Sequence, residues 1–131
     1  MKKISFNVQN DEIVFKKIPN YENYLVSNTG IVLSSVSGKI MSAHINKSGY
    51  KRIELTSTNG VRKKYLVHRL VLSAFPDING NMLELDSNYN DCSVDHLDKN
   101  RTNNSAINLE IVTQAENLNR RYKEHALWGF M

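Results

Sequence analysis

Asp95 and His96 are neighbours in the sequence, and Asn117 follows them by little more than twenty residues. A neutral imidazole accepts a proton near pH 7. Carboxylate and amide oxygens are hard ligands that suit Mg²⁺ or Mn²⁺ better than zinc. These side chains therefore offer a base and a hard metal site, provided that the fold brings them together. The ordinary alternative, a surface histidine–aspartate pair and a helix-surface amide, stays open at this point.

Two other groupings of potential metal ligands do not meet the requirements of a site. Cys92 and His96 have the spacing of half a zinc site, but Cys92 is the only cysteine, so a second pair does not exist. The segment from Asp86 opens like an EF-hand loop, yet its sixth position is Asp91 instead of Gly and its twelfth is Leu97 instead of Glu. A single cysteine also excludes an internal disulfide and suits a reducing compartment, so we expect a cytoplasmic protein.

A helix is predicted to carry Asn117. Thr113 and Glu116 have the spacing of a capping box, in which the hydroxyl accepts from the N3 amide and the carboxylate reaches back to the N-cap amide. Spacings of three and four residues place Asn117 on one face with Arg120 and Arg121. An amide oxygen and two guanidinium groups therefore point the same way.

Strands are predicted on either side of an Asn-rich loop before this helix. The first ends at His96, and the second covers residues 109–112. This order of strand, loop, strand and helix can bring Asp95 and His96 next to Asn117, although they lie apart in the sequence.

Two β-hairpins are predicted nearer the start of the chain. Residues 24–27 and 31–34 are β-rich runs that flank an Asn-Thr-Gly turn. Residues 49–56 and 61–67 repeat the arrangement around Thr-Asn-Gly, with apolar and polar residues alternating along the first run.

Apolar residues over 67–75 then recur at helical spacing, which predicts a short helix that Pro76 ends. A long acidic loop over residues 77–93 follows, with an apolar anchor at Met82, Leu83 and Leu85.

Basic residues are concentrated in the first half of the chain. The net charge is +4, but residues 1–65 carry eleven Lys and Arg against four Asp and Glu, whereas residues 66–131 carry six against nine. Neutralisation of phosphates with release of counterions supplies most sequence-independent affinity for nucleic acids, so a basic front favours such a partner. A charged solvent face that protects an edge strand is the alternative. The candidate contacts are Lys51, Arg52, Arg62, Lys63 and Lys64 on the second hairpin, with Arg101, Arg120 and Arg121 around Asn117.

The length and composition point to one domain. The chain has 131 residues, of which 40% are hydrophobic and 23% charged, as in globular proteins. No stretch approaches the roughly 20 apolar residues that cross a bilayer, and the first residues do not form an apolar leader. We therefore expect a protein that is neither membrane-spanning nor secreted.

Three segments carry a family resemblance. Residues 94–104 read VDHLDKNRTNN, and residues 108–117 read NLEIVTQAEN. Together they resemble the motif of HNH endonucleases, in the branch found in phages and intron-encoded homing endonucleases. VHRLV at 67–71 and YENYLVSNTG at 21–30 resemble the segments that precede the motif in that branch. The resemblance covers roughly residues 18–120.

The resemblance implies an α+β fold, in which a small N-terminal β-hairpin module precedes a ββα-metal nuclease motif. It implies that His96 is the general base and that Asp95 and Asn117 bind one divalent metal ion, Mg²⁺ or Mn²⁺. It also implies that Asn108 braces the loop that presents the histidine. Lys99 stands where the family often has Gly, and because lysine tolerates positive φ poorly, we expect an altered turn there.

We therefore expect a metal-dependent endonuclease that hydrolyses DNA, acting as a monomer or homodimer. The expected divisions are an arm (1–17), a β-rich module (18–66), a nuclease core (67–124) and a tail (125–131). One alternative is a phage-type DNA-binding accessory protein that keeps the fold without cleavage, and another is a nuclease acting on RNA. Homing endonucleases of this branch usually continue into a C-terminal DNA-recognition region. Because this sequence ends at Met131, we expect no specificity for a long target site.

Overall fold

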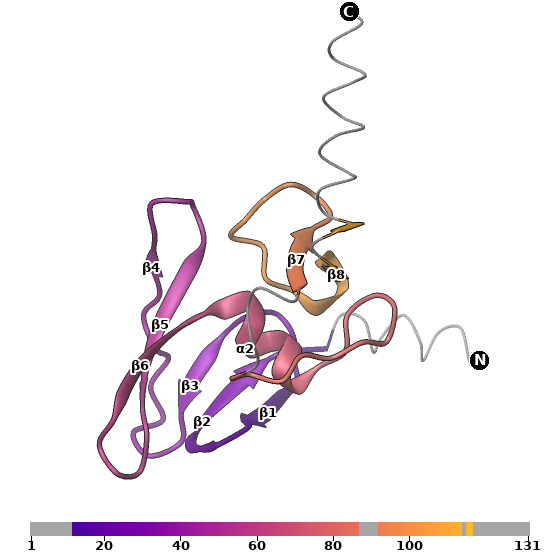
Figure 1. Ribbon diagram of the computed structural model, residues 1–131. Coiled ribbons are helices and arrows are strands. Elements are labelled where there is room, and N and C mark those ends of the chain that lie inside the picture. Colours follow the sequence, from indigo (N-terminus) through magenta and orange to yellow (C-terminus); the bar gives the residue numbers. More distant parts are fainter. Residues whose placement is uncertain (1–11, 87–91, 114, 117–131) are drawn as a thin grey trace, which may run out of the picture.

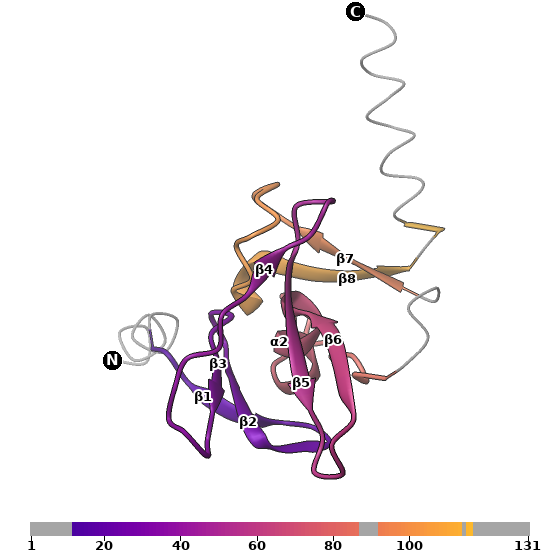
Figure 2. The same ribbon diagram turned by 90° about the vertical axis from the view of Figure 1, so that its left-hand side faces the viewer.

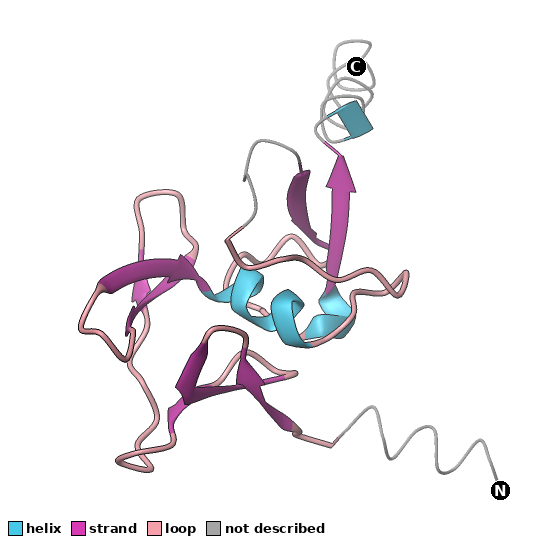
Figure 3. Ribbon diagram, turned by 60° about the horizontal axis from the view of Figure 1, so that its bottom comes forward, coloured by secondary structure: helices cyan, strands magenta, loops and turns pink. Residues whose placement is uncertain are grey.

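Strands surround a short central helix in the computed structural model, which describes residues 12–86, 92–113 and 115–116. Within these residues the strands form two three-stranded sheets and one two-stranded ribbon. Figure 1 shows the helix α2 (Val67–Ala74) between the first sheet and the ribbon, and Figure 2 shows the same order from the side. Strands and loops enclose the helix in Figure 3 as well. The expected α+β class is confirmed.

The first sheet has the antiparallel order β1-β2-β3. The predicted first hairpin is confirmed as β2 (Tyr21–Ser27) and β3 (Val32–Ser34), although β2 begins earlier than we predicted. β1 (Phe15–Ile18) pairs with β2, so this part of the predicted arm is an edge strand. Residues 1–11 of the arm lie outside the described residues.

The second sheet contains the predicted second hairpin. β5 (Lys51–Thr56) pairs with β6 (Arg62–Leu66), and Ile53 and Leu55 point into the core, as the alternation predicts. β4 (His44–Ile45) adds a third strand that we did not predict. Its two exposed residues carry no alternating pattern by which it could be recognised.

The predicted short helix is confirmed as α2, and all eight of its residues are buried. It ends at Ala74, and Phe75 has extended backbone angles because Pro76 disfavours the helical conformation in the residue before it. The helix begins directly after β6, and one hydrophobic cluster extends from Ile18 in the first sheet to Leu109 in the ribbon. The boundary that we predicted between a β-rich module (18–66) and a nuclease core (67–124) stays a prediction, because one hydrophobic cluster includes residues from both sides of it. Within the described residues, no helix has the length and apolar character to cross a membrane.

The loop after α2 is attached to the ribbon by Asp77, a buried carboxylate. Its Oδ1 accepts hydrogen bonds from the backbone N–H groups of Asn79 (2.8 Å) and Asn81 (2.9 Å), and its Oδ2 accepts from that of Ile111 (2.7 Å). Within the predicted apolar anchor, Leu85 is buried and Leu83 packs against the core, whereas Met82 is exposed. Residues 87–91 of the predicted loop lie outside the described residues.

The ribbon that carries the candidate site consists of β7 (Cys92–His96) and β8 (Leu109–Thr113). Both predicted strands are confirmed, and a short 3-10 turn, η1 (Ala106–Asn108), precedes β8. The antiparallel register places His96 opposite Leu109. The Thr113 hydroxyl accepts a hydrogen bond from the Glu116 amide (3.1 Å), as expected of a helix cap. The helix positions that we assigned to Asn117, Arg120 and Arg121 lie outside the described residues.

Candidate active site

His96 ends β7, and its imidazole is buried. Its Nε2 lies 2.9 Å from the side-chain oxygen of Asn104, which is also buried. An amide oxygen only accepts hydrogen bonds, so Nε2 is the donor in this contact. Within the described residues, Nδ1 is then the ring nitrogen that can accept a proton.

The turn between β2 and β3 packs against Asn104. A Cβ atom on Gly30 would lie only 3.0 Å from the Cβ of Asn104, and Gly30 has φ +95°, a conformation that other residues rarely adopt. The carbonyl of Asn28 in the same turn accepts a hydrogen bond from the Ala106 amide (2.8 Å). The first sheet therefore contacts the loop that holds His96 in place.

Asn108 connects the two ends of the loop between β7 and β8. Its side-chain oxygen accepts from the Asp98 amide (3.0 Å), and its Nδ2 donates to the Asp98 carboxylate (3.0 Å) and to the Asn103 carbonyl (2.9 Å). The side chain of Asn103 also donates to Asp98, and this hydrogen bond is the main cause that lowers the pKa of Asp98. These contacts fix the backbone that directly follows His96.

Lys99 occupies the tight turn in this loop. Its φ is +66°, the left-handed conformation that glycine adopts freely, and its amide donates to the carbonyl of His96 (2.9 Å). The backbone is therefore glycine-like, in contrast to the altered turn that we expected. A lysine in this conformation costs about 1–2 kcal/mol relative to an ordinary one.

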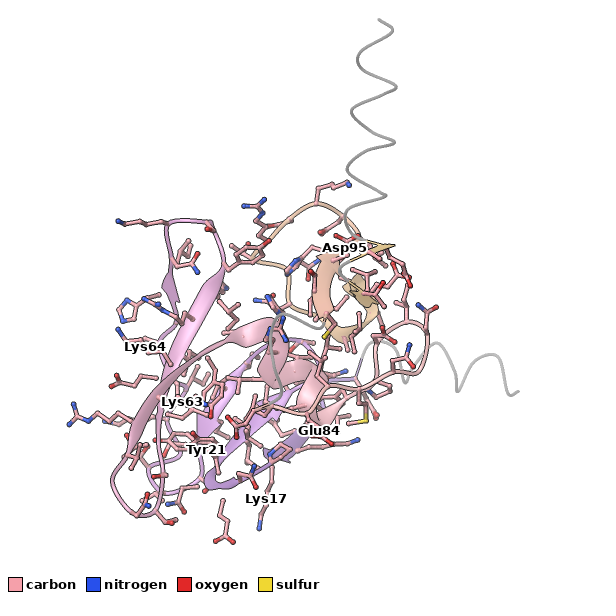
Figure 4. The ribbon with its side chains drawn as sticks, viewed as in Figure 1. Lys17, Tyr21, Lys63, Lys64, Glu84 and Asp95 are labelled. Atoms are coloured by element: carbon pink, nitrogen blue, oxygen red, sulfur yellow. The ribbon has the colours of Figure 1, made fainter. Side chains whose placement is uncertain are left out.

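Asp95 precedes His96 on β7, where it is half-buried and lies opposite Glu110 of β8 (Figure 4). No group of three or more His, Cys, Asp or Glu side chains capable of holding a metal lies within residues 12–86 and 92–116 as described. A carboxylate oxygen is a hard ligand of the kind that binds Mg²⁺, which usually keeps several waters. The donor chemistry of Asp95 therefore fits the implied hard metal ion.

Two aromatic rings contact the His96 imidazole. The centroid of the His68 ring lies 5.5 Å away at an interplanar angle of 74°, and that of the Tyr50 ring lies 5.8 Å away at 39°. His68 is buried on α2, and its Nδ1 makes no hydrogen bond within the described residues. Burial lowers the pKa of His68 to about 3, and the nearby His96 and Arg69 act in the same direction.

The pKa of His68 predicts that acid destabilises the fold. In the unfolded chain a histidine binds a proton near pH 6.5, whereas the buried ring resists protonation until about pH 3. Between these values the unfolded state binds more protons, so the free energy of unfolding falls as the pH is lowered below about 6.5. We expect a loss of about 2 kcal/mol between pH 7 and pH 5 from this group. Urea unfolding at both pH values measures it.

The His68→Leu variant isolates this contribution, because it removes the titrating group and keeps an apolar side chain. The difference in unfolding free energy between wild type and His68→Leu must then change between pH 7 and pH 5. His44→Leu is the matched control, since His44 is exposed on β4. A His68→Leu protein that loses as much stability as wild type over this pH range contradicts the prediction.

The structure divides the predicted basic residues between two faces of the second sheet. Arg52, Arg62 and Lys64 share the outer face with Glu54 in the cross-strand register. Lys63 points to the other face, where its ammonium group lies 2.9 Å from the carboxylate of Asp86. This hydrogen bond is the main cause that lowers the pKa of Asp86. Figure 4 shows Lys63 and Lys64 on β6, well apart from Asp95 in this view.

Lys51 and Arg101 lie near the tip of the β4–β5 turn. Lys51 pairs with Ile45 at the start of β5, and Arg101 reaches this turn from the loop after β7. The guanidinium of Arg101 lies 4.9 Å from the Tyr50 ring centroid and donates a hydrogen bond to the carbonyl of Ser48. Arg101 therefore joins the loop after β7 to the β4–β5 turn.

Four residues of this site were not recognised from the sequence as parts of it: Asn104, Asp98, Tyr50 and His68. Asn104 and Asp98 lie inside the motif, where a run of polar residues around a strand end was the available signal. His68 and Tyr50 lie far from His96 in the sequence, and their ring contacts depend on the packing of α2 and of the β4–β5 turn.

Two family models match consecutive parts of the chain. The NUMOD4 motif matches residues 14–56, and the HNH endonuclease family matches residues 65–119. The first match includes β1 to β5, and the second includes α2, the ribbon and the positions of Asp95, His96, Asn108 and Asn117.

Relatives among characterised proteins are phage endonucleases. The DNA endonuclease I-HmuI of Bacillus phage SP01 is 39% identical over 115 residues, which are 86% of this chain and 60% of that protein. The H-N-H endonuclease F-TflII of Escherichia phage T5 is 33% identical over 102 residues, which are 78% of this chain and 49% of that protein. The chain thus spans about half to three fifths of these relatives.

A solved structure has the same fold. The structure described as DNA binding and cleavage by the HNH homing endonuclease I-HmuI superposes with a TM-score of 0.70 at 38% identity. The similarity covers 86% of this chain and 59% of that one. The motif around His96, the order of the elements and these relatives agree, and the chain belongs to the HNH endonuclease family.

Proposed function

We propose that the protein is a metal-dependent endonuclease that hydrolyses phosphodiester bonds of double-stranded DNA. The observation that carries the proposal is the hydrogen bond from His96 Nε2 to Asn104, which leaves Nδ1 as the base. The half-buried Asp95 directly precedes His96 on β7. The similar protein I-HmuI is a DNA endonuclease of a Bacillus phage, which supports DNA as the substrate. Such an origin would place its action in the cytoplasm of a bacterial host.

The proposed reaction is an in-line displacement at phosphorus. Nδ1 of His96 takes a proton from a water molecule as the water oxygen forms its bond to phosphorus. The bond from phosphorus to the 3′ oxygen breaks, and the departing 3′ oxyanion takes a proton from solvent to give a 3′-hydroxyl and a 5′-phosphate. Asn104 keeps the imidazole in the required tautomer. Asn108 and Asp98 hold the backbone of the loop that directly follows His96. These residues act on the base and do not contact the substrate.

Asp95 and Asn117 are proposed to hold one divalent metal ion, Mg²⁺ or Mn²⁺, which supplies charge neutralisation at the phosphate and the leaving oxygen. Basic residues that do not bind the metal ion have a separate role, which is to bind the DNA backbone. We assign phosphate contacts to Arg52, Arg62 and Lys64 on the outer face of the second sheet and to Lys51 near the β4–β5 turn. For Lys63, Arg101, Arg120 and Arg121 the same assignment stays a prediction.

The test is incubation of supercoiled plasmid with the purified chain in Mg²⁺ or Mn²⁺. We expect metal-dependent conversion to open-circle or linear DNA, and EDTA must abolish the conversion. One active site per chain cuts one strand, so open-circle product indicates a nick. Linear product from the outset would indicate a dimer that cuts both strands. A plasmid that binds in a gel shift but stays supercoiled contradicts cleavage and favours the accessory-protein alternative. Parallel reactions with RNA of equal length separate a DNA nuclease from an RNA nuclease.

A further inference from the structure

Tyr50 has no role in the proposed reaction, yet it lies at the centre of the contacts around His96. Its ring centroid lies 5.8 Å from that of His96 and 5.5 Å from that of His68, and the two histidine rings lie 5.5 Å apart. The three rings thus contact one another in pairs. They come from the turn before β5, the start of α2 and the end of β7, which are far apart in the sequence.

Several contacts fix the position of Tyr50 itself. Its amide donates to the side-chain oxygen of Asn46 (3.0 Å), and its carbonyl accepts from the Asn46 amide (2.8 Å). On the ring, the Arg101 guanidinium lies 4.9 Å from the centroid, and the same guanidinium donates to the carbonyl of Ser48. Tyr50 is therefore held by its own turn and by the loop that follows His96.

The hydrogen bond to Asn104 leaves one motion of His96 open. A single bond at Nε2 fixes that atom, but the ring can still rotate about the axis through it and so turn Nδ1 away from its target. Rings packed against the imidazole restrict this rotation. His68 contacts it nearly edge to face at 74°, and Tyr50 contacts it at 39°.

We propose that Tyr50 is a positioning residue, which together with His68 holds the His96 imidazole so that Nδ1 stays aligned for the attacking water. This inference rests on the proposed function, because it assigns Tyr50 to the base of that reaction. A misplacement of a reacting group by about 1 Å can cost about 10²-fold in rate. Loss of the Tyr50 ring is therefore expected to lower the rate of the chemical step and to leave DNA affinity nearly unchanged.

The first test compares Tyr50→Leu with Tyr50→Phe in the full chain on supercoiled plasmid. At saturating DNA, we expect Tyr50→Leu to lower the cleavage rate about tenfold or more, with an unchanged half-saturating DNA concentration. Tyr50→Phe keeps the ring and is expected to retain the wild-type rate. Tyr24→Leu is the matched control, since Tyr24 is a half-buried tyrosine in the first sheet. If Tyr50→Leu cleaves at the wild-type rate, or only its DNA affinity falls, the proposal is wrong.

The second test needs no activity, so it separates this inference from the proposed function. In the wild-type protein without metal or DNA, nuclear Overhauser contacts between the ring protons of Tyr50 and His96 are expected. Tyr50→Leu must shift the His96 ring signals and leave those of His44 in place, whereas Tyr50→Phe must preserve them. Absence of the wild-type contacts overturns the inference even if the variant does not fold. A wild-type protein that shows them but cuts no nucleic acid overturns the proposed function alone.

Discussion

We expect His96→Ala to reduce the rate of plasmid cleavage about 10²–10⁴-fold, the contribution typical of a general base. The reason is that the side chain removed is the one whose Nδ1 is left to accept a proton when Asn104 binds Nε2. The phosphate contacts proposed for β5 and β6 stay in place, so binding measured by gel shift must change little. Initial rates at saturating DNA measure the effect.

His44→Ala is the matched control for this change, because it removes the same side chain from the exposed strand β4. It must cleave at the wild-type rate. Circular dichroism of both variants checks that the fold is kept. A His96→Ala protein that cuts within a few-fold of wild type contradicts the assignment of His96 as the base.

Asp77→Ala is expected to lower the free energy of unfolding by about 3 kcal/mol. Its carboxylate is buried and accepts three backbone hydrogen bonds, and hydrogen bonds to charged groups contribute roughly 1.5–3 kcal/mol each, with incomplete additivity. The variant leaves these amides without their acceptor and detaches the loop after α2 from β8. Urea denaturation followed by circular dichroism gives the value.

Glu84→Ala tests whether the loss belongs to Asp77 itself. Glu84 lies in the same loop and is exposed, so its removal is expected to change stability by no more than about 0.5 kcal/mol. Equal stability of the two variants would show that the hydrogen bonds of Asp77 do not hold the loop to the ribbon.

Local patterns in the sequence were sufficient to predict most elements. The first hairpin follows from β-rich runs around an Asn-Thr-Gly turn, and the second follows from alternation before a Thr-Asn-Gly turn. α2 follows from apolar residues at helical spacing before Pro76. The two strands of the ribbon were likewise predicted. β7 ends at His96 as predicted, and β8 extends one residue beyond the predicted range 109–112. These signals are local because the buried residues of a strand or a helix recur at a fixed spacing along the chain.

Contacts between distant segments could not be predicted in this way. The hydrogen bond from His96 to Asn104 spans eight residues, but the contacts of His96 with Tyr50 and His68 depend on how three separate elements pack. The β4 strand is two exposed residues long, and it exists because β5 offers it a partner. The arrangement of the candidate site is therefore a property of the tertiary structure, whereas its residue types are visible in the motif.

Lys99 shows the opposite kind of error. We inferred an altered turn from the intrinsic preference of lysine, yet the residue adopts φ +66°. The loop around it is fixed by the hydrogen bonds of Asn108 and Asp98 and by that from its own amide to His96. Together these contacts outweigh a conformational cost of about 1–2 kcal/mol.

The close approach of Gly30 and Asn104 has a consequence for how genes of this family can recombine. A crossover between residues 66 and 67 would join the turn of one parent to the catalytic loop of another. Any parent with a larger residue at position 30 would press its Cβ against Asn104, which lies only 3.0 Å from that position. Hybrids are therefore expected to be viable when the incoming N-terminal half keeps glycine there.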